Sequence, residues 1–271
     1  MLNTAKKLLT LNIQNFFRIL EISKSDQARK YRGSDLGRVW AFVTPMMYIC
    51  VFYFAIEFGF KGSKDIDDLV CPYFIWMSTG ITSWFYIRDM ITEGANCFRK
   101  HRNLILETQF PNSTIPVISS VSALRIHLIM IGVVLVLALL FGVRPSIYWL
   151  ELPVFMGLMV LFETLWAYVA GLITVVNRDF LNFLKSIKTA FFWLSGILFD
   201  PRNIDVPKVQ VFFKWNPITF LTSGYRDALC YHKGLVSMGD AWICFFIEML
   251  ILLVLTVVLY RKLEKSIPDI V

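Results

Sequence analysis

Apolar runs separated by short polar segments dominate the pattern of this 271-residue chain. The runs predict six transmembrane helices, which we place at residues 39–60, 70–87, 115–143, 148–176, 183–199 and 241–260. A helix needs about 20 apolar residues to cross a bilayer, and these runs approach or exceed that length. The pattern therefore predicts an all-α integral membrane protein.

Residues 187–231 depart from this regular pattern. The fifth run breaks at Phe199-Asp200-Pro201, and a second break follows at Trp215-Asn216-Pro217. The pieces of residues 209–231 are too short to cross a bilayer, yet they are too apolar for a simple solvated loop. Two short re-entrant helices between the fifth and sixth spans fit this segment, provided that protein or water satisfies the interrupted backbone.

The first 20 residues carry one apolar helical face. Leu9, Ile13, Phe16, Phe17 and Leu20 recur at helical spacing, with basic residues beside them. This predicts an interfacial amphipathic helix on the inner leaflet, and the alternative is a helix docked on another domain. We therefore divide the chain into a cytoplasmic helix and basic lead at residues 1–38 and a six-helix transmembrane domain at residues 39–271.

The composition and charge support a membrane protein. The chain is 56% hydrophobic and 17% charged, whereas soluble domains are about 45–50% apolar and about 25% charged. The net charge of +7 comes from basic residues that gather between apolar runs, which favours membrane topology over nucleic-acid binding. Most Lys and Arg fall on the side that holds both termini. We therefore predict cytoplasmic termini and re-entrant helices on the outer side.

The chain lacks the signatures of common catalytic sites. It has no P-loop, HExxH or GxSxG sequence, and its three histidines and five cysteines are scattered. We therefore predict no catalytic residue, no metal site and no cofactor in this chain. Glu163, Glu248 and Arg125 lie inside apolar runs. They either line a pathway or make structural hydrogen bonds, and both interpretations stay open.

Aromatic residues make up 15% of the chain, and the first run holds several of them. Among these we single out Trp40, Tyr48 and Phe52. Their rings either stack against the sugars of a polysaccharide or form the aromatic belt that contacts lipid. If the substrate is a glycan, at least a few of the aromatic residues should line its path.

Basic residues gather where the first and fifth runs meet the predicted cytoplasmic interface. They include Arg38, Lys185 and Lys188. These side chains either hold a diphosphate headgroup by charge-assisted hydrogen bonds or only set the membrane topology. The two lysines, three residues apart on one helix face, are the better candidates for headgroup binding.

Three motifs, in this order, resemble those of the ABC-2 type exporter permeases. They are Arg29–Trp40 (RKYRGSDLGRVW) with Thr44-Pro45 after it, Gln109-Phe110-Pro111 followed by Ile115-Pro116, and Leu194–Phe199 (LSGILF) with Trp215-Asn216-Pro217 and Tyr225-Arg226. Each motif is loose, but together they extend over nearly the whole chain. No motif among them names a substrate.

Within this family the chain is similar to permeases for lipid-linked surface polymers, above all the wall teichoic acid exporters, with O-antigen and capsule permeases as alternatives. The resemblance implies ATP-driven export of an undecaprenyl-diphosphate-linked polymer across a bacterial cytoplasmic membrane. It also implies a homodimer bound to two copies of a separate ATPase, which would hold ATP and Mg²⁺. Two other classes stay open: an exporter of drugs or small lipids, and a membrane-embedded transferase.

The resemblance also assigns roles to residues. A coupling loop would contact the ATPase through Glu93, Asn96, Phe98, Arg99, Lys100 and Asn103. The first and fifth spans would border a channel between the two subunits, with a substrate path along Arg38, Trp40, Tyr48, Phe52, Lys185, Lys188, Phe192 and Trp193. The re-entrant helices would gate the outer exit through Trp215, Asn216, Pro217, Tyr225 and Arg226.

Overall fold

A computed structural model of the chain describes residues 2–30, 33, 35–55, 58, 69–107 and 110–270. These residues form helices, turns and loops and include no β-strand. The side chain of Arg38 and the whole of Gln109 lie outside the described part. Within that part, the prediction of an all-α chain is confirmed.

Three helices are long and apolar enough to cross a membrane in the described part of the chain. They are α7 (Ile115–Leu140), α8 (Leu152–Val176) and α12 (Ala241–Leu263). They correspond to the third, fourth and sixth predicted spans, so these three predictions are confirmed as helices of sufficient length and apolarity. The protein is thus an integral membrane protein with several apolar helices.

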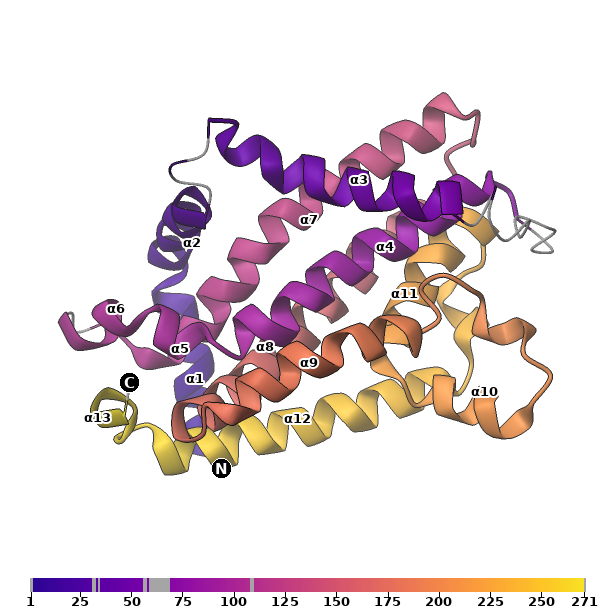
Figure 1. The fold of residues 1–271 in the computed structure, drawn as a ribbon. Helices are drawn as coiled ribbons and strands as arrows, with labels where there is room; N and C mark the ends of the chain where they lie inside the picture. The colour runs from indigo at the N-terminus through magenta and orange to yellow at the C-terminus, as the bar shows by residue number, and fades with distance from the viewer. Residues whose placement is uncertain are drawn as a thin grey trace.

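The remaining predicted spans form shorter helices. They are α3 (Trp40–Phe54), α4 (Tyr73–Asp89) and α9 (Asp179–Trp193). Each is shorter than the roughly 20 residues that a straight span requires, so the six-span topology stays a prediction. In Figure 1, α4 lies between α3 above it and α9 and α12 below it.

The two ends of the helical bundle differ. Both termini lie at the end that carries α5 (Cys97–Lys100), α6 (Arg102–Glu107) and α13 (Ile267–Ile270), whereas α10 (Pro207–Lys214) lies at the opposite end (Figure 1). The predicted coupling loop and the predicted re-entrant segment therefore lie at opposite ends of the molecule.

The fifth predicted span ends earlier than its sequence suggests. We placed the break at Phe199, but α9 ends at Trp193 and a turn follows it. Gly196 in this turn has a φ of 66°, a left-handed conformation that glycine adopts without steric cost and that often ends helices. A Cβ at Gly196 would lie 2.3 Å from the Pro201 ring, so the turn also requires a small residue.

Two short helices occupy the segment predicted to be re-entrant. They are α10 and α11 (Pro217–Arg226), and a π-helical turn, η7 (Asp227–Tyr231), continues α11. Each helix begins with proline at its first position, where the missing N–H costs no hydrogen bond. The presence of two short helices is confirmed, and their insertion into the membrane stays a prediction.

The N-terminal segment forms α1 (Leu2–Gln14) and α2 (Phe16–Lys30), which meet at Asn15. Leu8 and Ile19 are buried in an apolar cluster that includes Phe98 of α5 and Tyr168 of α8. The predicted apolar face points elsewhere, because Leu9, Ile13, Phe16 and Phe17 are all exposed. The helices thus dock on the protein through one face and leave a second apolar face free. That this second face lies on the inner leaflet remains a prediction.

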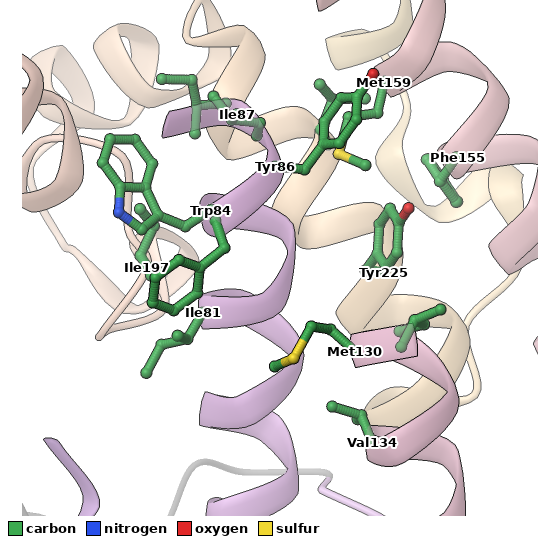
Figure 2. Packing of buried hydrophobic residues seen from close by; sticks show 14 of the residues in the cluster. Ile81, Trp84, Tyr86, Ile87, Met130, Val134, Phe155, Met159, Ile197 and Tyr225 are labelled. Atoms are coloured by element: carbon green, nitrogen blue, oxygen red, sulfur yellow. The ribbon is translucent and has the colours of Figure 1, made fainter. Parts of the chain in front are cut away.

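Helix α4 lies at the centre of the main core. Figure 2 shows its Ile81, Trp84, Tyr86 and Ile87 among residues of α7, α8 and α11, including Met130 and Tyr225. Every residue of α4 from Ile75 to Ile87 is buried. A helix buried on all sides shows no amphipathic pattern, which explains why its sequence predicts a span but no preferred face.

Hydroxyl groups inside α4 bond to their own helix. Ser78 donates to the Phe74 carbonyl at 2.6 Å, Thr79 to the Ile75 carbonyl at 2.8 Å and Ser83 to the Thr79 carbonyl at 3.1 Å. These bonds satisfy buried polar groups without a partner on another helix. The small side chains also let the neighbouring helices approach closely.

We expect Gly224→Ala to destabilise the protein, because a Cβ there would lie 2.2 Å from the Phe155 ring of α8. Overpacking of this kind costs about 1–3 kcal/mol of unfolding free energy. The measurement is denaturant or thermal unfolding of the purified protein in detergent. Gly157→Ala is the matched control, since no atom lies within 4 Å of that position. A Gly224→Ala protein as stable as the control would contradict the close packing of α11 on α8.

Candidate functional site

Aromatic side chains from α3, α4 and α9 meet in one cluster. Phe52 lies 5.3 Å from Phe192 between ring centroids, and Trp84 lies 5.5 Å from the same ring. Tyr48 contacts both Phe52 and Phe85, and Trp193 contacts Phe192 edge to face. We call Tyr48, Phe52, Trp84, Phe85, Phe192 and Trp193 the aromatic cluster. Such edge-to-face and tilted contacts are the arrangements that aromatic pairs prefer.

The aromatic cluster contains four of the residues predicted to line a substrate path. Of these, Tyr48 is 49% exposed and Trp193 is 56% exposed, so the cluster offers rings to its surroundings. The sequence did not single out Trp84 and Phe85, whose buried rings support Phe192 and Tyr48 from below. Both lie on α4, whose sequence shows no preferred apolar face, so nothing in the sequence separated them from ordinary core residues.

Two lysines precede the aromatic cluster on α9. Lys185 is exposed and Lys188 is half-buried, and Phe192 follows Lys188 by one helical turn on the same face. Trp40, also predicted to line the path, borders a cavity of about 230 Å³ between α3, α4 and α7. Phe85 of the aromatic cluster lines the same cavity, together with Thr82 and His127. Trp40 therefore adjoins the cluster through this cavity, whereas the lysines are related to the cluster by their positions along α9.

At the end of the molecule that carries α10, Asn216 joins the turn after α9 to the start of α11. Its Oδ1 accepts from the backbone N–H groups of Ile218 at 3.0 Å and Thr219 at 3.3 Å, which caps α11. Its Nδ2 donates to the Leu194 carbonyl at 3.0 Å and to Ser195 Oγ at 3.1 Å. One side chain thus satisfies polar groups at both breaks of the helical backbone. Its neighbour Trp215 is exposed.

Arg226 fills the space behind this cap and is fully buried. Its guanidinium donates to the Gly196 carbonyl at 2.8 Å and to the Ile197 carbonyl, and it lies 3.4 Å from the centroid of the Trp76 ring. A Cβ at Gly80 of α4 would clash with this guanidinium, so Gly80 leaves room for it. Arg226 thus ties α11 and α4 to the turn after α9.

Tyr225, the other predicted gate residue on α11, contacts the opposite side of the core. Its hydroxyl lies 2.9 Å from His127 Nε2 of α7, and both residues are buried. The His127 ring packs edge to face on Tyr86 of α4, whose hydroxyl lies 2.7 Å from Ser120 Oγ. Tyr225 and Arg226, two of the predicted gate residues, are therefore buried and held by contacts within the chain.

A charged group beneath the cap was not predicted. Arg202 pairs with Asp200 at 2.8 Å and with Asp227 at 2.7 Å, and its guanidinium lies over the Tyr231 ring. Burial would raise the pKa of the Asp200 carboxyl, but the bonds from Arg202 outweigh burial and lower it. These pairs hold the loop after α9 against η7, and a sequence alone could not show that residues 25 apart form an ion pair.

The predicted coupling residues lie on η3 (Met90–Gly94), α5 and α6. Phe98 is fully buried and packs on Gly171 of α8, where a Cβ would lie 3.0 Å from its ring. Arg99 donates to the carbonyls of Thr174 at 3.2 Å and Val175 at 3.0 Å, at the C-terminal end of α8. Cations at such a helix end bind otherwise unpaired carbonyl groups. These two side chains attach the loop to the membrane helices.

The other predicted coupling residues are more accessible. Lys100 and Asn103 are exposed, while Glu93 and Asn96 are half-buried. Lys100 pairs with Glu93 at 3.3 Å, which links η3 to α5. These four side chains are placed where a partner protein could reach them.

Asp26 of α2 binds this loop and was not predicted. Its carboxylate is 2% exposed and lies 2.6 Å from Lys100 Nζ, 3.4 Å from His101 Nε2 and 3.1 Å from the Arg29 guanidinium. Burial would raise the pKa of the carboxyl, but the interactions with His101 and Lys100 outweigh burial and hold the pKa well below its usual range. A second link comes from Arg125 of α7, which donates to Ser23 and to the Leu20 carbonyl of α2. Arg125 thus makes structural hydrogen bonds in this structure.

Comparisons with a family model and with individual proteins point to the same family. A model described as "ABC-2 type transporter" matches residues 18–230. The O-antigen export system permease protein RfbA of Myxococcus xanthus is 22% identical over 79% of this chain and 81% of its own length. A protein of the same name from Klebsiella pneumoniae is 23% identical over 93% of this chain and 94% of its own length.

We expect Asp26→Asn to loosen α2 from the coupling loop and to lower the unfolding temperature at neutral pH. Because the folded pKa of Asp26 is depressed, its contribution is fully present above the ordinary carboxyl pKa of about 3.9 and is lost as the pH falls through the lower folded value. The gap between wild type and variant should therefore be present at about pH 5 and should shrink as the pH falls below about 4.

Glu21→Gln provides the control for Asp26→Asn, because it removes an exposed carboxylate from the same helix. Its unfolding temperature should match that of the wild type. If Asp26→Asn behaved like Glu21→Gln at pH 7, the ion pairs of Asp26 would not hold the two segments together.

Variants of Asn216 should separate its two roles. Asn216→Asp keeps an acceptor for the cap of α11 but loses both donor bonds to residues 194 and 195. Asn216→Ala loses the cap as well as the donor bonds. Loss of an N-cap costs about 1 kcal/mol, so we expect Asn216→Ala to be the less stable of the two in thermal unfolding. Equal stability of Asn216→Ala and wild type would contradict the bridging role.

Proposed function

Because the chain belongs to the ABC-2 type transporter family, we propose that it is the permease subunit of an ATP-driven exporter of a lipid-linked surface polysaccharide. The chain is a transmembrane subunit without a catalytic domain, and its family implies a separate ATPase partner. Our expectation of wall teichoic acid receives no support from the relatives described above. Those relatives are O-antigen export permeases, so they favour the alternative, a glycan of the O-antigen or capsular type.

The aromatic cluster is the observation that supports a glycan substrate. Sugar rings present C–H faces that pack on aromatic rings, and Tyr48 and Trp193 are half exposed on neighbouring helices. Lys185 and Lys188 precede the cluster on α9, where cations would suit the diphosphate that carries the glycan. The order of these groups along α9 would match a headgroup followed by its sugars.

A second copy of the chain would complete the path. We propose that α3 and α9 of two copies face each other, so that the exposed rings of the cluster line a channel between them. The lipid-linked glycan would enter from the inner leaflet beside α1 and α2, whose second apolar face is exposed. The cap formed by α10 and α11 would close the outer end, in a bacterial cytoplasmic membrane with both termini inside.

The ATPase would act on the loop that contains η3, α5 and α6. Glu93, Asn96, Lys100 and Asn103 would make the contact, and Phe98 and Arg99 would transmit it to α8. The two ATPase copies would supply ATP and Mg²⁺, since this chain would contribute no catalytic residue. Asp26 would extend the same movement to α2.

Deletion of the gene tests this function. We expect the surface polysaccharide to disappear and the lipid-linked glycan to accumulate inside, as measured by labelling of intact and lysed cells. Complementation with Tyr48→Ala and Trp193→Ala together should restore export about tenfold less well than wild type, since each ring is worth about 0.5–1.5 kcal/mol. Phe246→Ala, an exposed ring on α12, is the matched control and should export normally.

Other outcomes would reject this proposal. If the deletion strain kept its surface polysaccharide but lost cell-wall phosphate polymer, the substrate would be a teichoic acid. If only the sensitivity to drugs rose, the chain would belong to a drug exporter. Normal export by the double variant at wild-type expression would remove the aromatic cluster from the substrate path.

A further inference from the structure

A large apolar cavity lies on the other side of α9 from the aromatic cluster. Its volume is about 710 Å³, and α8, α9, α12 and the two short helices α10 and α11 surround it. Phe191 of α9 and Leu194 just after its end line the cavity, while Phe192 between them belongs to the aromatic cluster. The cavity therefore contains no residue of the aromatic cluster, and it shares with the proposed path only the start of α11.

Two carboxylates line this cavity from facing helices. Glu163 of α8 is 3% exposed, and its Oε2 atom has no hydrogen-bond partner among the described residues. Glu248 of α12 lines the same cavity and is half-buried. A buried ionised carboxylate within a membrane helix is unfavourable unless a cation or a donor compensates it, and otherwise the group takes up a proton. The lining residues provide no Lys or Arg, so nothing basic in the cavity does so.

Aromatic rings form much of the remaining wall. Phe162, Trp166, Phe191, Phe212 and Trp215 all line the cavity. The face of an aromatic ring attracts organic cations, and the attraction grows when the site excludes water. Several rings around one carboxylate are the arrangement by which proteins hold quaternary ammonium groups.

Metal ions fit this cavity poorly. Divalent cations such as Ca²⁺ need about six or more oxygen ligands, and the described part of the chain has no group of three or more His, Cys, Asp or Glu side chains that could hold a metal. An apolar wall with two carboxylates instead suits a cation that carries its own apolar surface.

We propose that this cavity binds a lipophilic organic cation. The positive group would lie between Glu163 and Glu248, and its apolar substituents would pack against the aromatic wall. The single positive charge of the ligand would compensate one ionised carboxylate while the other carboxyl stays protonated, and the ligand would reach the cavity from the bilayer. Because Trp215 and Asn216 border the cavity, an occupied site would touch the start of α11.

Tetraphenylphosphonium is a suitable probe, because it is a permanent cation with an apolar surface and does not titrate. Its binding to the full-length chain in a neutral alkyl-glycoside detergent can be followed by equilibrium dialysis of radiolabelled probe. We expect saturable binding with about one site per chain. Glu163→Gln combined with Glu248→Gln should weaken the affinity at least about tenfold, since isosteric amides keep the shape and remove both charges.

Two further variants identify the cause of any loss. Glu107→Gln removes an exposed carboxylate on α6, far from the cavity, and should bind the probe like wild type. Leu252→Trp keeps both carboxylates but narrows the cavity, and it should also weaken binding. Elution as a single peak and an unchanged unfolding temperature would verify that each variant is folded.

Three results would overturn the proposal. The first is a lack of saturable binding by the wild-type chain, which would leave lipid tails or a second copy as the occupant. The second is equal affinity of the folded double variant and wild type. The third is competition by the uncharged analogue tetraphenylmethane as strong as that by unlabelled probe, since the cavity would then select apolar surface rather than charge.

Discussion

The need to satisfy backbone polar groups inside a membrane protein governs the part of this structure that contains α10 and α11. The chain breaks its helical hydrogen bonds after Trp193 and again at Asn216, and unpaired carbonyl and amide groups in an apolar setting cost several kcal/mol each. Asn216 and Arg226 meet this requirement from opposite sides of the turn. Thr219 adds a third bond, from its hydroxyl to the Ser195 carbonyl at 3.1 Å, so side chains of α11 and its N-cap satisfy the carbonyl groups of residues 194–197.

At the other end of the molecule, charged side chains bind the polar groups that the helices leave unpaired. Arg99 binds the carbonyl groups that end α8, and Gly171 lets α5 approach that helix closely. Asp26 then fixes Lys100 and His101 to α2. The loop between α4 and α7 is therefore attached to two neighbours, and its exposed side chains stand on a rigid base. If the loop contacts the ATPase as proposed, this attachment would let it pass movement on to α8 and α2.

Local sequence patterns predicted the features that depend on neighbouring residues alone, such as the length of an apolar helix or the residue at which a helix begins. Apolar length identified α7, α8 and α12, and the Asn216-Pro217 pair located the start of α11. The end of α9 was misplaced, because Pro201 is the stronger sequence signal although Gly196 makes the turn. Trp84, Asp26 and the partners of Arg226 could not be predicted, since each depends on a contact between segments far apart in the chain. Thus the sequence named candidate residues one by one, and only the fold showed which of them lie together.

The bond between Asp26 and Lys100 has a mechanical consequence. The ion pair joins α2 to the loop that we propose contacts the ATPase, so a displacement of one segment would pull on the other. If α1 and α2 lie on the inner leaflet as predicted, each stroke of the ATPase would also shift lipids at the place where the substrate enters. The work of transport would then be divided between the protein and the bilayer, so the thickness and lateral pressure of the membrane would enter the energetics of export.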